Sequence, residues 1–266
     1  MVRSTLLRKA SLVGAFFVSV FLVSPVRAAC PLVESLAPLR VAKVVDGDTL
    51  RLADGRSVRL IGINAPERAR DGRPAEPFAE AARKRLQTLV AANDGRVGLR
   101  VGSRARDQYG RTLAHAYDSA GRNLEAQLLA EGLGYQVAFQ PATGLEDCHR
   151  GAEDEARRQR LGLWQQATVV TPFDLRSGGF ALVRGKVERV QRNRGGLWIE
   201  MDGPLVLRVE PKLLRHFDVA ALQRLAGRDV EVRGWVIDRS RRGGVQPDQA
   251  RWMLPLTHAA MLEVLP

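Results

Sequence analysis

Apolar and polar positions along the chain define two β-rich regions with a break between them. In the first region, an apolar run begins at residue 41, Leu50 and Leu52 alternate with polar residues, and a second apolar run covers residues 58–63. Alternation with a period of two is typical of strands that have one face in a core. We therefore expect consecutive strands before residue 64.

The Asp-Gly pair at positions 54 and 55 predicts a tight turn between two of these strands. A two-residue type I′ loop needs positive φ angles at both positions, which Asp and Gly tolerate. That loop pairs Ala53 with Arg56 and places Asp48 opposite Ile61. It folds the Asp48 end of the hairpin back towards residues 64–67.

Helical spacing replaces this alternation in three later segments. Apolar residues recur at intervals of three and four from Phe78 to Leu89, and Asn-Asp-Gly at 93–95 is a stop signal. Asn123 is a suitable N-cap, and Gly162 a suitable terminator. The predicted helices cover residues 76–92, 123–130 and 146–161, and further strands are predicted near residues 97–101 and 112–118.

The pattern breaks down at residues 166–179, which form the predicted linker. Alternation then resumes, and a helix is predicted at 219–225 among strands at 180–190, 197–201, 205–209 and 230–237. Short strands around one helix are typical of a small closed barrel of the OB type. We predict a fold that is mainly β with helices (α+β), with one domain at residues 40–165 and an OB-like β-barrel accessory domain at residues 180–266.

The first residues have the layout of a secretory signal peptide. Arg3, Arg8 and Lys9 precede an uncharged apolar run at residues 10–23, and small residues follow Pro25. Cleavage after residue 28 predicts a secreted or periplasmic protein without a stable membrane span. The alternative is an uncleaved N-terminal segment that anchors the protein.

The chain is strongly basic, with a net charge of +12 and a sequence pI of about 10.8. Residues 1–28 carry four positive charges and no acidic residue, so about +8 remains after their removal. A basic surface of this kind predicts an anionic partner. The four histidines lack the spacing of zinc ligands, which argues against a zinc site.

The cysteine count adds a covalent constraint. Cys30 and Cys148 are the two cysteines of the chain. An even number of cysteines in an exported protein predicts one disulfide bond. The alternative is a pair of free thiols.

Four short segments carry the candidate chemistry. They are Asp46-Gly47-Asp48-Thr49 and residues 59–67, 107–111 and 153–164. In order and spacing they resemble the staphylococcal nuclease (thermonuclease) family over about residues 40–165. The resemblance implies an OB-fold barrel with three helices, hydrolysis of phosphodiester bonds and one bound Ca²⁺ ion.

Phosphodiester hydrolysis places extra negative charge on the phosphate oxygens, which the planar and permanently charged arginine side chain can neutralise. The resemblance implies that Arg59 and Arg111 are catalytic residues that bind the phosphate. It also implies that Glu67 is the catalytic residue that acts on the attacking water. Tyr109 and Tyr117 are candidates for contacts with a sugar or base, with core packing as the alternative.

The resemblance places the calcium ligands at Asp48, at Asn64 and at the main-chain carbonyl of Ala65. Asn64 stands where the family has its second metal-binding aspartate. An amide oxygen carries no formal charge, and calcium affinity follows the charge of the ligands. We therefore expect a weaker metal site than in relatives that have aspartate at this position.

These residues also have non-catalytic interpretations. Asp48 could cap a turn, Arg59 could lie on a strand surface, and Arg111 could pair with Asp107 within a turn. The combined spacing favours the catalytic interpretation. In the C-terminal region, Trp198 or Trp235 could stack on single-stranded nucleic acid, but both lie in apolar strand patterns, so we expect core positions.

Together these observations predict an exported, calcium-dependent nuclease, monomeric, that acts on single-stranded or denatured DNA, RNA or both with little sequence preference. One alternative is a protein that binds nucleic acid without cutting it, because Asn64 replaces the metal-binding aspartate. Another is an envelope structural or protein-binding module.

Overall fold

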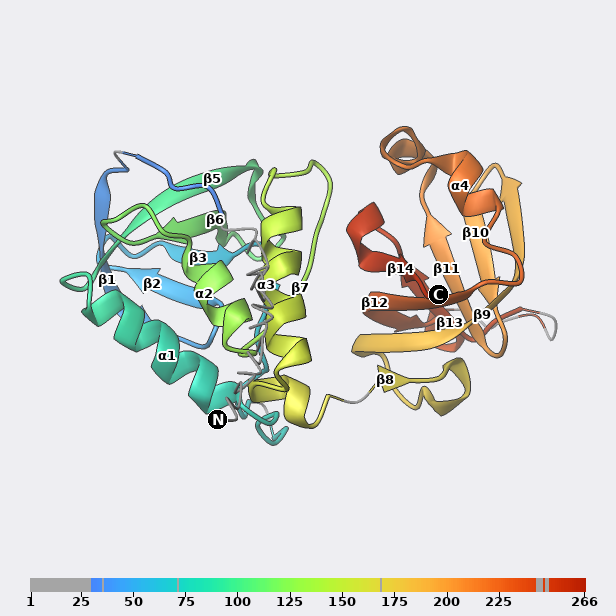
Figure 1. Ribbon diagram of the computed structural model, residues 1–266, viewed down its shortest axis with the longest axis horizontal. Coiled ribbons are helices and arrows are strands. Elements are labelled where there is room, and N and C mark those ends of the chain that lie inside the picture. Colours follow the sequence, from blue (N-terminus) through green and yellow to red (C-terminus); the bar gives the residue numbers. More distant parts are fainter. Residues whose placement is uncertain (1–29, 35, 71, 168, 243–245, 247–248) are drawn as a thin grey trace, which may run out of the picture.

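The computed structural model describes residues 30–266 with the exception of residues 35, 71, 168, 243–245, 247 and 248. The predicted signal peptide, residues 1–28, lies outside the described residues. Among those described, no helix combines the length and the apolar character needed to cross a membrane. Two β-rich units lie next to each other, and α3 (Glu146–Arg158) is on the side of the first unit that faces the second (Figure 1).

The first unit is a closed five-stranded barrel with the strand order β1-β2-β3-β6-β5. β3 and β6 run parallel, whereas the neighbouring pairs around the rest of the ring are antiparallel. Alternate residues such as Leu50, Leu52, Val58 and Leu60 fill the interior. This α+β barrel confirms the predicted fold class. Its strands are β1 (Pro38–Val44), β2 (Thr49–Leu52), β3 (Ser57–Leu60), β5 (Arg96–Arg106) and β6 (Thr112–Tyr117).

The β2–β3 hairpin differs from the prediction by one residue. The loop has three residues, 53–55, because the Leu52 N–H donates to the Arg56 carbonyl. Gly55 takes a φ of 90°, as the last position of a three-residue loop requires. Asp48 therefore lies opposite Leu60, whose N–H donates to the Asp48 carbonyl at 2.8 Å. The prediction that Asp48 lies opposite Ile61 was wrong by one residue.

Helices cover the barrel where the periodicity predicted them. α1 (Ala79–Ala91) buries apolar side chains at intervals of three and four along one face. It begins later than predicted, because Phe78 has a left-handed φ of 66°. In α2 (Leu124–Ala130), the Asn123 side chain accepts a hydrogen bond from Ala126 N, which confirms the predicted N-cap. The short strands β4 (Ile63–Asn64) and β7 (Tyr135–Gln136) pair with each other.

Cys30 and Cys148 form a disulfide bond, as predicted, with 5.0 Å between their Cα atoms. The bond ties the segment before β1 to α3. Tyr117 and Leu145 pack in the same small apolar cluster. The prediction that Tyr117 contacts substrate was wrong, because its side chain is fully buried there.

The second unit is β-rich, as predicted, and it has its own apolar core. Pairing between β12 and β9 joins the two ends of the run β9-β10-β11-β13-β12. The neighbouring strands β11 and β13 of this run are parallel, as β3 and β6 are in the first barrel. The elements are β8 (Val169–Val170), β9 (Gly179–Asn193), β10 (Gly196–Met201), β11 (Leu205–Val209), α4 (Val219–Gln223), β12 (Asp229–Asp238), β13 (Trp252–Pro255) and β14 (Leu262–Val264).

Charged side chains join α3 to the second unit. Glu153 and Arg233 form an ion pair that is almost fully buried. One turn further along α3, Arg157 donates two hydrogen bonds of 2.8 Å to the Glu231 carboxylate on β12. Buried, bidentate pairs of this kind hold their partners in one geometry. The two units are therefore fixed relative to each other by α3 and β12.

Candidate active site

The first acidic residues of the site lie on the turn between β1 and β2. A Cβ added to Gly47 would come within 2.6 Å of the Ala65 Cβ and 2.7 Å of the Ala82 Cβ. Only glycine therefore lets this turn pack so closely against α1. The Asp46 side chain accepts a hydrogen bond from Asp48 N at 3.0 Å, so the two acidic residues are held next to each other.

The Asp48 carboxylate is buried between the turn and β4. Its Oδ2 atom accepts a hydrogen bond from Ala65 N at 2.9 Å and lies 2.9 Å from Arg59 Nη1. Burial raises the pKa of the Asp48 carboxyl to about 7, against the opposing effect of Arg59 and with a further increase from Asp46. The positive charge of Arg59 thus offsets only part of the cost of burying this carboxylate.

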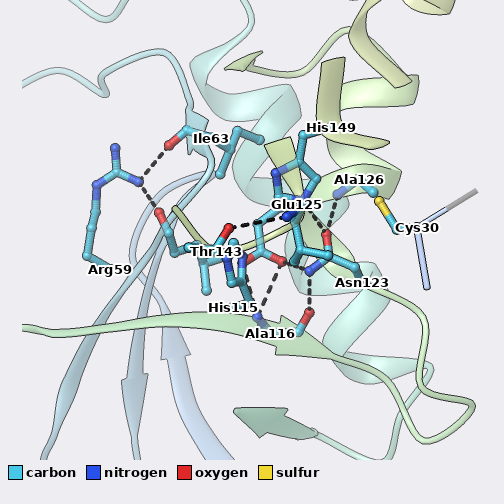
Figure 2. Close-up of polar contacts among 12 residues, drawn as sticks. Cys30, Arg59, Ile63, His115, Ala116, Asn123, Glu125, Ala126, Thr143 and His149 are labelled. Carbon is cyan, nitrogen blue, oxygen red and sulfur yellow. Dashed lines mark hydrogen bonds and ion pairs between the residues drawn. The ribbon is translucent and has the colours of Figure 1, made fainter. Parts of the chain in front are cut away.

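Arg59 lies near the end of β3, and its guanidinium is held by the segment that follows. Nη1 donates to the carbonyls of Leu60 at 2.6 Å and Ile63 at 2.9 Å, and Figure 2 shows the contact with Ile63. Nη2 lies 3.3 Å from the Asn64 Oδ1 atom, to which it donates. The planar side chain is therefore oriented before any substrate binds.

Glu67 lies on the exposed segment between β4 and α1. Its N–H donates to the Glu76 carboxylate at 2.9 Å, and Glu76 N donates back to the Glu67 carbonyl at 2.9 Å. Partial burial raises the pKa of the Glu67 carboxyl, and Asp46 raises it further, whereas Arg59 and Arg111 lower it. These electrostatic interactions place Glu67 within range of both arginines and of the Asp46 turn.

Arg111 closes the turn between β5 and β6. Asp107 accepts a hydrogen bond from Arg111 Nε at 2.7 Å and another from Arg111 N at 2.9 Å. The guanidinium lies 5.6 Å from the centre of the Tyr109 ring, and that ring is 75% exposed. The pair with Asp107 therefore orients Arg111, and Tyr109 is accessible to a ligand.

The structure brings together residues from three of the four predicted segments. Asp48, Arg59, Asn64 and Ala65 are in direct contact, and Glu67 interacts electrostatically with both arginines. The sequence analysis had not assigned a role to Asp46 or Glu76. Asp46 could have been found from its place two residues before Asp48, whereas no local signal marks Glu76 as a partner of Glu67.

A polar cluster that the sequence analysis missed lies behind the site. Figure 2 shows His115, His149, Asn123 and Glu125 gathered in one group, with Cys30 to the right of them. His149 Nε2 is 2.9 Å from Asn123 Oδ1, and the rings of His115 and His149 are 5.5 Å apart. Burial, followed by the neighbouring His115, lowers the pKa of His149 to about 3. His149 is therefore neutral at ordinary pH. Its contact with Asn123 joins α3 to the N-cap of α2.

Oxygen atoms at the Asp46 turn form a donor set that fits a divalent cation. Asp46 and Asp48 supply carboxylates, and Asn64 supplies an amide oxygen that can accept more than its bond from Arg59. Burial raises the pKa of Asp48, and the nearby Asp46 carboxylate adds to the increase. A cation between these side chains would offset it.

Comparisons with known proteins agree with this geometry. Residues 57–166 match the family described as staphylococcal nuclease homologue. Over 129 residues, the chain is 31% identical to a thermonuclease of Staphylococcus intermedius, covering 47% of this chain and 75% of that protein. It is 30% identical over 140 residues to an uncharacterized endonuclease of Escherichia coli, covering 50% of this chain and 81% of that one.

The chain belongs to the staphylococcal nuclease family. It is also 33% identical over 144 residues to the endonuclease YncB of Bacillus subtilis (strain 168), covering 52% of this chain and 66% of that protein. For the prophage-derived endonuclease YokF of the same organism, the match covers 47% of that protein. The chain thus spans about half to two thirds of the length of these two relatives.

Proposed function

We propose that this protein is an exported, metal-dependent nuclease that hydrolyses phosphodiester bonds in DNA, RNA or both with little sequence preference. The main support is that Arg59 contacts both Asp48 and Asn64 and lines the same cleft as Arg111. Membership of the staphylococcal nuclease family adds to this support, as do relatives that are named as endonucleases and a thermonuclease. The basic net charge suits a polyanionic substrate.

Each residue of the site has a role in the proposed reaction. Arg59 and Arg111 bind oxygens of the scissile phosphate and stabilise the charge that develops on them. Glu67 accepts a proton from the water whose oxygen attacks phosphorus, and a carboxylate with a raised pKa is a better base. The bond from phosphorus to the leaving oxygen then breaks, and that oxygen takes a proton from solvent.

We infer that Ca²⁺ is the metal of this site. Asp46, Asp48, Asn64 and the main-chain carbonyl of Ala65 would hold it. When bound, the ion acts as a Lewis acid on a phosphate oxygen and orients the attacking water. With Asn64 in place of a carboxylate, we expect weaker binding than in relatives that have aspartate there.

The direct test uses heat-denatured DNA and RNA with the mature chain, in the presence of calcium or of a chelator. We expect cleavage with calcium that stops with the chelator. Glu67→Gln should lower turnover by about 10²-fold or more while binding persists, whereas Glu80→Gln, an exposed α1 variant outside the site, should cleave as the wild type does. Salt-sensitive binding without cleavage under any metal would contradict the proposal and favour a nucleic-acid-binding protein.

A further inference from the structure

A cleft of about 550 Å³ extends from the candidate active site to the second unit. Arg59, Arg111 and Tyr109 line its wall on the first barrel. Arg208 and Trp235 line its wall on the second unit. Because buried ion pairs fix the two units through α3 and β12, this cleft has a set shape. A polymer held at the arginines can therefore continue into it.

Two exposed aromatic side chains lie in the cleft. Phe139, from the segment before α3, stacks on Trp235 of β12 with 5.7 Å between ring centres and 30° between planes. Phe139 is 43% exposed and Trp235 is 37% exposed. The expectation that Trp235 is a core residue was therefore wrong. Phe180 contacts Trp235 edge-on at 5.1 Å, which fixes the orientation of the indole ring.

Trp198, the other tryptophan expected in the core, is half-buried on β10. The guanidinium of Arg208 lies 5.0 Å from the centre of its ring, and Arg208 Nε donates to the Gly195 carbonyl at 3.0 Å. These contacts hold the Arg208 charge at the cleft wall. Among the described residues, no carboxylate forms an ion pair with Arg208, so its charge is available to an anion.

The charge of the cleft is predominantly positive. Two of its acidic side chains are already paired with cleft cations, Asp107 with Arg111 and Glu210 with Lys212. Glu146, a third, accepts hydrogen bonds from the N–H groups of Thr143 and Gly144. Arg104 and Arg208 also line the cleft, form no ion pair with a carboxylate of the described residues, and add positive charge. A polyanion fits this distribution better than a neutral or cationic ligand.

We propose that the cleft binds one strand of nucleic acid next to the scissile phosphate, with bases stacked on Phe139 and Trp235 and a backbone phosphate at Arg208. This inference rests on the proposed function, because the same strand must reach Arg59 and Arg111. The ligand is single-stranded, since stacking on a side chain needs a base face that a duplex covers with its neighbours. The second unit thereby forms part of the substrate-binding site.

Fluorescence anisotropy with a labelled oligothymidylate of about 20 nucleotides tests this inference on the full mature chain. The measurements use the Glu67→Gln background, with the strand checked by electrophoresis to be intact. We expect Phe139→Ala to weaken binding by about 10-fold, the size of one lost stacking contact. Phe173→Ala, which removes a 58% exposed aromatic outside the cleft, should bind as the background does.

Salt dependence tests the cationic part separately. Arg208→Gln should lower the slope of log affinity against log salt by about 0.7, as for one phosphate contact to a single strand. Arg224→Gln removes an exposed charge of the same unit outside the cleft and should leave the slope unchanged. Circular dichroism and thermal melts of each variant identify losses that come from misfolding, and Phe139→Leu provides a milder replacement at the same position.

The outcomes separate this inference from the nuclease proposal. If Phe139→Ala and Arg208→Gln are folded and bind the oligonucleotide as tightly as the background, the cleft inference is wrong even when the wild type cleaves. If the wild type fails to cleave under any metal while both variants lose affinity, the cleft inference holds and the nuclease proposal is wrong. Equal affinity of the Glu67→Gln background for duplex and single strand would overturn the single-strand assignment.

Discussion

Arg59 Nη1 lies 2.9 Å from Asp48 Oδ2, so the candidate phosphate ligand and a candidate metal ligand are paired with each other. The pair is buried, and the raised pKa of Asp48 indicates that burial outweighs the attraction of Arg59. A carboxylate that is costly to bury and yet retained is typical of a functional site. A bound cation would give Asp48 a further partner of opposite charge, and a substrate phosphate would do the same for Arg59.

The first prediction concerns Asp48→Asn. The pKa of the Asp48 carboxyl rises from 3.8 to about 7 on folding. The folded protein therefore loses stability as pH increases through this range. Asparagine does not titrate, so the variant should gain about 2 to 4 kcal/mol relative to wild type between pH 4 and pH 8, and it should lose activity. Thermal melts of both proteins with chelator test this. If the unfolding free energy of Asp48→Asn relative to wild type fell between pH 4 and pH 8, the prediction would be wrong.

The second prediction concerns the two arginines. Lysine keeps the charge but cannot bind two phosphate oxygens with one planar group. Arg59→Lys and Arg111→Lys should therefore each lower kcat/KM by about 10³-fold or more. Arg51→Lys, at an exposed position of β2, serves as the control and should retain activity. Turnover of Arg111→Lys within tenfold of wild type would mean that Arg111 serves only to pair with Asp107.

The third prediction concerns Asn64→Asp. The side chain already faces Arg59, with 3.3 Å between Asn64 Oδ1 and Arg59 Nη2, so a carboxylate of the same shape fits. Added ligand charge should lower the half-saturating calcium concentration by about 10-fold or more. Calorimetric titration with calcium measures affinity independently of cleavage. An unchanged calcium affinity would place the metal away from Asn64.

Much of the first barrel could be predicted because local signals were strong. The alternation at Leu50 and Leu52 and the N-cap at Asn123 each involve residues that are close together in the sequence. The hairpin register was missed by one residue, since an Asp-Gly pair is compatible with both two- and three-residue loops. Very short strands such as β4 and β7 lack the length that periodicity needs, and their pairing depends on residues far along the chain.

Asp48, Glu67 and the two arginines could be chosen as candidates from motif spacing, whereas contacts between the two units could not be predicted. Phe139 and Trp235 are almost 100 residues apart, and neither has a local signal for the other. Trp235 lies in an apolar run of β12, yet its ring is exposed at the cleft. The buried pair of Glu153 and Arg233 likewise depends on how α3 meets β12.

The last prediction concerns Glu231, which receives hydrogen bonds from Arg157 and Arg184. Burial alone would raise the pKa of this carboxyl, but the two arginines outweigh it and lower the pKa from 4.5 to about 2. A lowered carboxyl pKa contributes stability that is complete above pH 4.5 and is lost as pH falls towards 2. Glu231→Gln should therefore be about 3 kcal/mol less stable than wild type at pH 7, because the buried carboxylate loses its charged hydrogen bonds with Arg157 and Arg184.

The difference in unfolding free energy between Glu231→Gln and wild type should narrow as pH falls from 4.5 to 2, and urea unfolding at pH 7, 4.5 and 3 measures it. The pKa of Glu153 is raised by burial, so its effect on the pH dependence of stability is opposite to that of Glu231. Both proteins contain Glu153, and subtracting one unfolding free energy from the other removes its contribution. Glu200→Gln breaks the exposed pair with Arg189 and should change stability by less than about 1 kcal/mol. If the Glu231→Gln deficit stayed constant down to pH 3, ionic contacts with Arg157 and Arg184 would not be what holds β12 against α3.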